Sequence, residues 1–157
     1  MAIAYFYTWT TYGTWLPGDR RGWFQRGRGP QAPNPIREFE ATLRMSEVAI
    51  TLTLQQRLVV EKSITDHCAV RKWSLHAVNC RSNHAHVVVT VPNRPIEVPR
   101  EQFKSWCTGK LKELERALVP DTEMVLRENW WTERGWDEHV DDEPSLANFI
   151  AYVRDGQ

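Results

Sequence analysis

Residues 84–91 read His-Ala-His-Val-Val-Val-Thr-Val. From residue 85 onward this stretch alternates and is rich in β-branched side chains, which predicts a strand whose odd-numbered residues enter the core. Residues 73–78 read Trp-Ser-Leu-His-Ala-Val and predict another strand, and residues 79–83 turn the chain between the two. Two strands joined by a turn are therefore expected here.

Two long helices are expected to flank these strands. The first begins after Thr53, which is placed to cap it, and continues to about Val70. The second follows prolines 92, 95 and 99, which interrupt the strand pattern. The apolar positions are Leu54, Leu58, Ile64 and Cys68 in the first helix, and Phe103, Cys107, Leu111, Leu114 and Leu118 in the second.

Further elements at both ends complete the sheet. Residues 3–12 predict a strand with one face made of Ile3, Tyr5, Tyr7 and Trp9. Residues 130–131 and 136–140 predict a further strand or hairpin, and residues 142–144 begin a last helix. This order predicts an α+β fold, a ferredoxin-like βαββαβ antiparallel sheet with both long helices on one face and a C-terminal helix. The other face is expected to be open for function.

Residues 14–50 predict a long basic and aromatic loop, punctuated by glycine and proline, inserted after the first strand. Loops of this length are uncommon unless they bind something or are disordered, so a binding arm and a mobile insertion are the two alternatives. With 157 residues in total, the chain is expected to be a single domain, residues 1–157.

Composition restricts the class of protein. With 41% hydrophobic and 25% charged residues, the chain is typical of soluble globular proteins. No apolar run approaches the roughly 20 residues of a membrane span, and no signal peptide is recognisable. Three widely spaced cysteines argue against a disulfide framework, so a cytoplasmic location is expected. The net charge is zero, but residues 1–120 are net basic and 121–157 net acidic, which permits a phosphate-binding face.

The pair His84 and His86 is the strongest chemical signal. Alternate residues of a strand share a face, so the two imidazoles converge and predict a divalent-metal site if a third ligand comes from elsewhere. The alternative is two surface histidines that bind no ion. A structural zinc site built from Cys80 with Cys107 or His139 is a weaker hypothesis, because such sites usually contain closely paired cysteines.

Tyr152 is the second signal. It lies at the flank of the apolar stripe of the last helix, where its hydroxyl is able to reach past the edge of the core. The alternative is an amphipathic tyrosine at the rim of a helix. The apolar stripe consists of Leu146, Phe149, Ile150 and Val153.

Together these motifs resemble the HUH-type single-tyrosine transposases, including the REP-associated tyrosine transposases. The resemblance is carried by Asn83-His84-Ala85-His86 before a valine run, and by Tyr152 downstream. Residues 11–22, Thr-Tyr-Gly-Thr-Trp-Leu-Pro-Gly-Asp-Arg-Arg-Gly, resemble the opening of a transposase-like subgroup. Residues 103–106 and 131–135 resemble the later helix and strand of the family, so the likeness covers essentially the whole chain.

The resemblance implies a ferredoxin-like fold, a magnesium or manganese ion on His84 and His86, and Tyr152 as the nucleophile that attacks single-stranded DNA. Family members commonly carry a glutamine or asparagine four residues after the tyrosine as a third metal ligand. This chain has glycine at that position, so Gln157 is the expected third ligand and Asp155 the rival. The expected activity is a metal-dependent transesterase that cleaves and rejoins DNA through a 5′-phosphotyrosine intermediate.

Basic and aromatic residues are the expected DNA contacts, with arginines on phosphates and aromatic rings on unpaired bases. The expected partner is single-stranded DNA with a hairpin, bound by a monomer or a homodimer. The main alternative is a domesticated module that binds single strands without cutting them, and a metallohydrolase of another class is the third hypothesis. The nominated contacts are Arg20, Arg21, Trp23, Arg26, Arg28, Lys104 and Lys112.

Overall fold

The computed structural model describes residues 1–119 and 126–155. Within them, four antiparallel strands form the main sheet, in the order β4-β5-β1-β6. Its strands are β1 (Ala4–Thr10), β4 (Ser74–Cys80), β5 (His84–Thr90) and β6 (Trp136–Val140). The helices of the sheet domain are α2 (Leu54–Arg71), α3 (Glu97–Leu118) and α4 (Glu143–Asp155). This α+β arrangement confirms the predicted ferredoxin-like fold.

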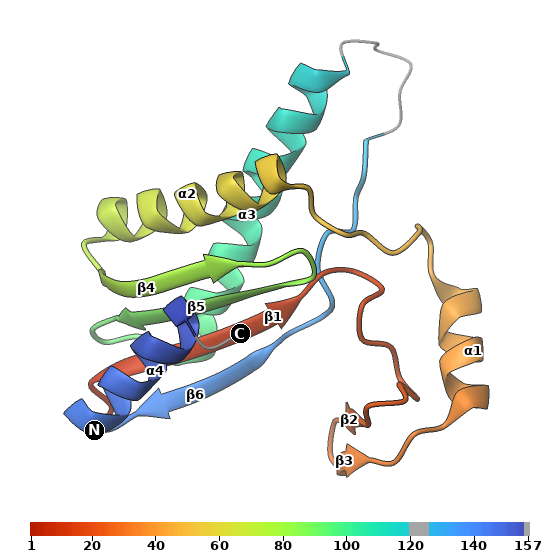
Figure 1. Cartoon of the computed structure of the whole chain (residues 1–157), viewed down its shortest axis with the longest axis horizontal. Helices are drawn as coiled ribbons and strands as arrows, with labels where there is room; N and C mark the ends of the chain where they lie inside the picture. The colour runs from red at the N-terminus through yellow and green to blue at the C-terminus, as the bar shows by residue number, and fades with distance from the viewer. Residues whose placement is uncertain (120–125, 156–157) are drawn as a thin grey trace.

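The sheet has a helical layer on each face (Figure 1). Helices α2 and α3 both pack on one face, as predicted, around a core that includes Trp9, Val87 and Phe103. Helix α4 packs on the opposite face against Phe6 and Val88. That face was expected to be open, and α4 covers part of it because its apolar stripe needs a partner surface. Among the described helices, none is long and apolar enough to span a membrane.

Helix α2 begins as predicted but buries a different face. Thr53 accepts a hydrogen bond from the backbone N–H of Gln56, whose side chain in turn accepts from the Thr53 N–H, and this reciprocal pair fixes the first turn. Leu54 and Leu58 belong to the apolar positions that predicted the helix, but they are 65% and 56% exposed. The buried stripe runs through residues spaced four apart, and Leu58 lies roughly 120° around the helix from Ile64.

Three smaller predictions were wrong. Ile3 precedes β1 and packs with the cluster on the α4 face, because the alternation of the strand does not extend to it. Trp131 forms only an isolated bridge with Thr11, so the last strand is confined to residues 136–140. Pro99 does not separate strand from helix. It lies in the first turn of α3, where no intrahelical N–H donor is needed.

The segment predicted as a loop, residues 14–50, contains regular structure. It forms the hairpin of β2 (Trp23–Gln25) and β3 (Gly29–Gln31), followed by α1 (Pro35–Arg44). We call residues 14–50 the arm. Figure 1 shows the arm beside the main sheet, on the side where β1 ends and β5 begins. Local turns and a helix cap replace the long unstructured loop.

Gly18 precedes the hairpin in the sequence and lies very close to the start of α1. Its φ is +93°, and a Cβ at this position would lie 2.3 Å from the carbonyl oxygen of Asn34 and 2.5 Å from the nitrogen of Glu38. Asn34 is the N-cap of α1 and accepts a hydrogen bond from the Arg37 N–H. Only glycine fits there, since a side chain would displace the start of the helix.

Replacing Gly18 with alanine is therefore expected to detach α1 within the arm, because the left-handed backbone costs about 1–2 kcal/mol and the clash adds to it. Hydrogen exchange of residues 35–44 measures this and should become faster. Gly27→Ala is the matched control, because Gly27 has a φ of +80° but no atom within 4 Å of its added Cβ. Equal exchange in the two variants would contradict the packing role of Gly18.

Candidate functional site

The candidate site lies on the α4 face of the sheet, where three neighbouring strands place side chains in one row. On β5, His86 is the register partner of Thr8 on β1 and of Asn79 on β4. Thr8 is also the register partner of Trp136 on β6. Register partners point to the same face of an antiparallel sheet, so the row runs Trp136, Thr8, His86, Asn79.

His84 and His86 share this face, as their spacing predicts. Their ring centroids are 4.7 Å apart, at an interplanar angle of 71°. The Nδ1 of His84 donates to the Asn83 Oδ1 at 2.7 Å, and the Nδ1 of His86 bonds the hydroxyl oxygen of Thr8 at 2.6 Å. The partners on Nδ1 orient each ring, an arrangement that is also common around metal-bound histidines.

Tyr152 is placed beside this pair by the packing of α4. Its ring meets the ring of His86 edge to face at a centroid distance of 5.4 Å, and that of Phe6 at 6.2 Å. The side-chain amide of Asn79 donates to the Val153 carbonyl at 2.9 Å, which ties the last turn of α4 to β4. Tyr152 is 45% exposed, so a ligand in solvent can reach its hydroxyl.

The other three tyrosines have structural contacts away from the histidine pair. The hydroxyl of Tyr5 donates to the Arg94 carbonyl, and that of Tyr7 to the Ile96 carbonyl. Both rings pack on the face covered by α2 and α3. Burial raises the pKa of the Tyr7 phenol. The hydroxyl of Tyr12 accepts a hydrogen bond from the Ser46 N–H in the arm.

His84 and His86 are candidate imidazole ligands for a metal, and the third ligand stays a prediction. Gln157, the expected third ligand, lies outside the described residues. Asp155 is exposed at the end of α4, and no group of three His, Cys, Asp or Glu side chains suited to a metal occurs within residues 1–119 and 126–155. The zinc hypothesis likewise finds no such group among the described residues. Burial raises the pKa of the Cys80 thiol to about 12, which disfavours the thiolate that zinc requires.

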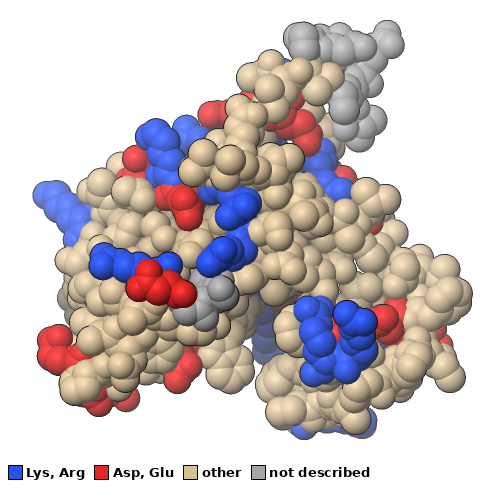
Figure 2. Space-filling model, in the orientation of Figure 1, with Lys and Arg blue, Asp and Glu red and all other residues tan. Residues whose placement is uncertain are grey.

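The arm exposes most of the nominated arginines, and Figure 2 shows Lys and Arg side chains gathered over it. Arg20, Arg26 and Arg28 are exposed, and their guanidinium groups form no ion pair with any described residue. Arg21 instead binds the Asp19 carboxylate, which lowers the pKa of that acid. Its guanidinium also lies 4.0 Å from the ring centroid of Trp15. Arg21 therefore stabilises the arm through its contacts with Asp19 and Trp15.

Trp23 is only partly available for stacking on an unpaired base. Its indole N–H donates to the Ala32 carbonyl, and the guanidinium of Arg37 lies 4.8 Å above its ring. One face of the ring is thus already covered. Phe24, the next residue of the hairpin, is 67% exposed.

Lys104 was nominated for DNA contact, and its placement is wrong for that role. It is 8% exposed, and its ammonium donates to the carbonyls of Thr132 and Arg134. Burial lowers its pKa, and its bonds hold the turn before β6. Helical spacing alone could not show that this side of α3 faces another segment. Lys112 is half-buried and forms an ion pair with Glu128 at 3.0 Å.

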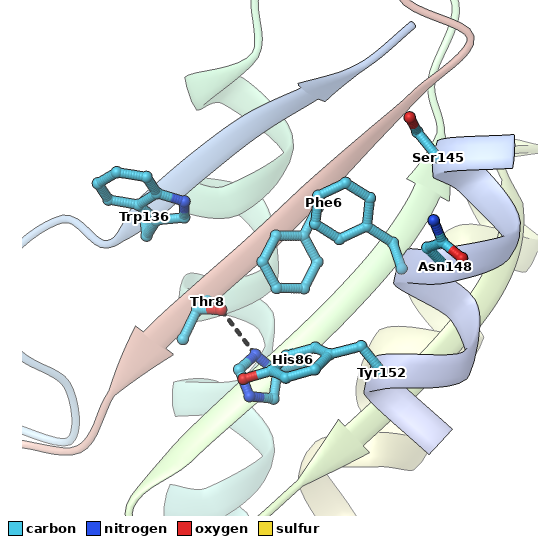
Figure 3. A pocket seen from close by; sticks show the side chains of 8 residues that line it. Phe6, Thr8, His86, Trp136, Ser145, Asn148 and Tyr152 are labelled. Carbon is cyan, nitrogen blue, oxygen red and sulfur yellow. Dashed lines mark hydrogen bonds between the residues drawn. The ribbon is translucent and has the colours of Figure 1, made fainter. Parts of the chain in front are cut away.

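An open groove of about 640 Å³ lies between α4 and β6 beside Tyr152. Figure 3 shows Trp136 on one side of this groove and Ser145 and Asn148 of α4 on the other, with Thr8, His86 and the ring of Tyr152 at one end. Sequence reasoning missed Thr8, Trp136 and Asn148, because no local pattern marks them. Cross-strand register places Thr8 and Trp136 in the row of His86, and the packing of α4 on this face places Asn148 beside them. The lining residues are Phe6, Thr8, His86, Trp136, Ser145, Asn148, Phe149 and Tyr152.

The fold and site define a ferredoxin-like α+β protein with a histidine pair and an accessible tyrosine on one face of its sheet. No protein-family model matches the chain, and no curated protein matches it. Among solved structures it is similar to a REP-associated tyrosine transposase bound to a REP hairpin, with a TM-score of 0.56 and 12% identity. The match covers 98% of this chain but 66% of the other, so the chain spans just under two thirds of that protein. The likeness shows a common fold.

Proposed function

We propose that this protein is a metal-dependent transesterase of the transposase type, which cleaves and rejoins single-stranded DNA. The observation that carries the proposal is the position of Tyr152, whose ring lies 5.4 Å from that of His86 and next to the pair His84 and His86. A nucleophile and a candidate metal site therefore lie side by side on one face of the sheet, although they come from distant parts of the chain. The similar transposase structure, with its bound hairpin, supports the same substrate class.

The residues present fit a divalent ion in part. Two imidazoles oriented through Nδ1 provide two nitrogen ligands, a donor set that suits manganese better than magnesium. In this proposal Gln157 adds an amide oxygen as the third ligand. Bound there, the ion supplies positive charge for a nonbridging oxygen of the scissile phosphate.

The chain itself supplies the nucleophile and its orientation. The phenolic oxygen of Tyr152 loses its proton to solvent and attacks the phosphorus, forming a Tyr–O–P bond as the bond to the 3′ oxygen breaks. The released 3′ oxygen takes up a proton and becomes a free hydroxyl. Because one phosphoester replaces another, a second 3′ hydroxyl can reverse the step and rejoin strands without ATP. Contacts with Phe6 and His86 limit the rotation of the tyrosine ring.

The test uses hairpin-bearing single strands with a label at the 3′ end, incubated with protein and Mn²⁺ or Mg²⁺. A 5′-phosphotyrosine intermediate transfers the label to protein in a denaturing gel. A shifted native complex without a covalent adduct would instead support the non-cleaving binding module, which the exposed arginines of the arm also favour. If neither a shifted complex nor a covalent adduct forms, both functions are contradicted.

The arm is expected to supply much of the affinity for phosphates. Changing Arg20, Arg26 and Arg28 together to glutamine should weaken binding and reduce the slope of log K against log salt by about 2, since each lost contact to a single strand removes roughly 0.7. Fluorescence anisotropy at several salt concentrations measures the slope.

The matched control removes the same charge at the other end of the sheet domain, by changing Arg71, Lys72 and Arg94, which are all exposed. This control should leave the slope nearly unchanged. If both triple variants lower the slope equally, the effect is one of net charge and the arm is not a DNA contact.

A further inference from the structure

The groove between α4 and β6 has the chemistry of a nucleobase site. We propose that it holds one unpaired base next to the scissile phosphate, stacked on Trp136, with Asn148 contacting the polar edge of the base. The inference rests on the proposed function, and it assigns substrate selection to protein side chains beside the nucleophile. Trp136 and Asn148 would then be specificity-determining residues for the strand that is cut.

The first argument is position. Trp136 and His86 are both register partners of Thr8, one on each side, so their backbones lie two strand spacings apart, about 10 Å. Tyr152 lines the same groove from α4, beside His86 (Figure 3). A phosphate held at the histidines therefore places an adjoining nucleotide over the groove.

The second argument is the aromatic surface. Phe6 is 5% exposed and stacks on Phe149 at a centroid distance of 4.7 Å, which makes a rigid apolar floor. Trp136 is 60% exposed, although a tryptophan is among the side chains with most to gain from burial. Its indole N–H donates to Glu138 at 3.2 Å, so the ring is held in place without being covered. A planar base can cover it.

The third argument is the polar lining. Asn148 is exposed, and its side-chain amide has no hydrogen-bond partner among residues 1–119 and 126–155. An amide offers one acceptor and two donors, the set that complements the edge of a nucleobase.

The charge around the groove favours a base over a phosphate. Among the described residues that line it, none is a lysine or arginine, whereas the acidic residues Glu138 and Asp142 lie close to Trp136 and Ser145 respectively. A phosphate would meet repulsion there, and a neutral aromatic ring would not. The groove therefore suits the base of a nucleotide whose phosphate lies at the histidines.

The test is photocrosslinking with a pool of hairpin-bearing strands whose single-stranded flanks contain 5-iodouracil, a base that crosslinks to stacked aromatic rings. The expected crosslink maps to the peptide containing Trp136 and is lost in Trp136→Leu. Trp106→Leu is the matched control, because Trp106 is 40% exposed on α3, which packs against the opposite face of the sheet. Crosslinks confined to Trp15 or Trp23, or an unchanged yield in Trp136→Leu, would overturn the proposal.

A second measurement separates stacking from a structural effect. Trp136→Ala should weaken binding about tenfold for an intact strand, in line with the loss of one stacked base, and Trp136→Phe should restore most of it. A strand lacking the base next to the cleavage position should bind the wild type and Trp136→Ala equally. Unequal binding of that abasic strand would overturn the assignment.

The two hypotheses fail in different ways. A crosslink at Trp136 without any covalent adduct would leave the base site standing and reject the transesterase. An adduct with no Trp136 crosslink would support the transesterase and reject the base site. Where adducts form, Asn148→Ala should broaden the range of bases found at the adjoining position when the linked strands are sequenced. An unchanged range would exclude Asn148 as a contact of the base.

Discussion

Tyr152→Phe is expected to abolish covalent adduct formation while DNA binding survives. The change removes one oxygen and keeps the ring that contacts His86 and Phe6. Because no other atom at this position can bond to phosphorus, cleavage should fall by a factor on the order of 10⁴ or more, as for other lost nucleophiles. The labelled-strand gel measures the adduct, and anisotropy measures binding.

The matched control for this variant is Tyr5→Phe. It also removes a phenolic hydroxyl, one that donates to the Arg94 carbonyl on the opposite face of the sheet, and it should retain full cleavage. Peptide mapping of the wild-type adduct should place the label on the peptide that contains Tyr152. A label on Tyr5 or Tyr12, or an active Tyr152→Phe protein, would refute the assignment.

The second large effect is expected from the histidine pair. Replacing His84 or His86 with alanine should lower cleavage on the order of 10²–10³-fold each, the usual effect of losing a group that stabilises transition-state charge. The double variant should show no cleavage, and EDTA should have the same effect on the wild type. Salt-dependent binding should change little, because phosphate affinity comes mainly from arginine and lysine.

His139→Ala is the control for these variants, since His139 is an exposed histidine of the neighbouring strand β6 that contacts Tyr5. His86 is 4% exposed, so its alanine variant leaves a cavity. His86→Gln therefore serves as a second variant with a smaller volume change, and thermal melting checks that each protein folds. Cleavage that survives both the double substitution and EDTA would reject the metal site.

Local patterns determined the strands, the long helices and the histidine pair. The strand at residues 84–90 and the cap at Thr53 follow from side-chain alternation and from a backbone N–H that needs an acceptor. The shared face of His84 and His86 follows from the two-residue period of a strand. Each of these features depends on residues close together in the sequence, so the sequence by itself is sufficient.

Only the tertiary structure decided which groups meet. The burial of Lys104 depends on the segment that carries Thr132 and Arg134, and the exposure of Leu54 depends on where α2 crosses the sheet. No periodicity within α3 or α2 contains that information.

The composition of the groove also depends on contacts between distant parts of the chain. Trp136 lies in the same row as His86 only through the register of β6 with β1, and Tyr152 contacts His86 only because α4 packs on that face of the sheet. Arg21 is likewise engaged by Asp19 once the arm folds. The sequence determined the candidate chemical groups, and the pairing of distant strands and helices decided their arrangement, because register and burial are set by non-local contacts.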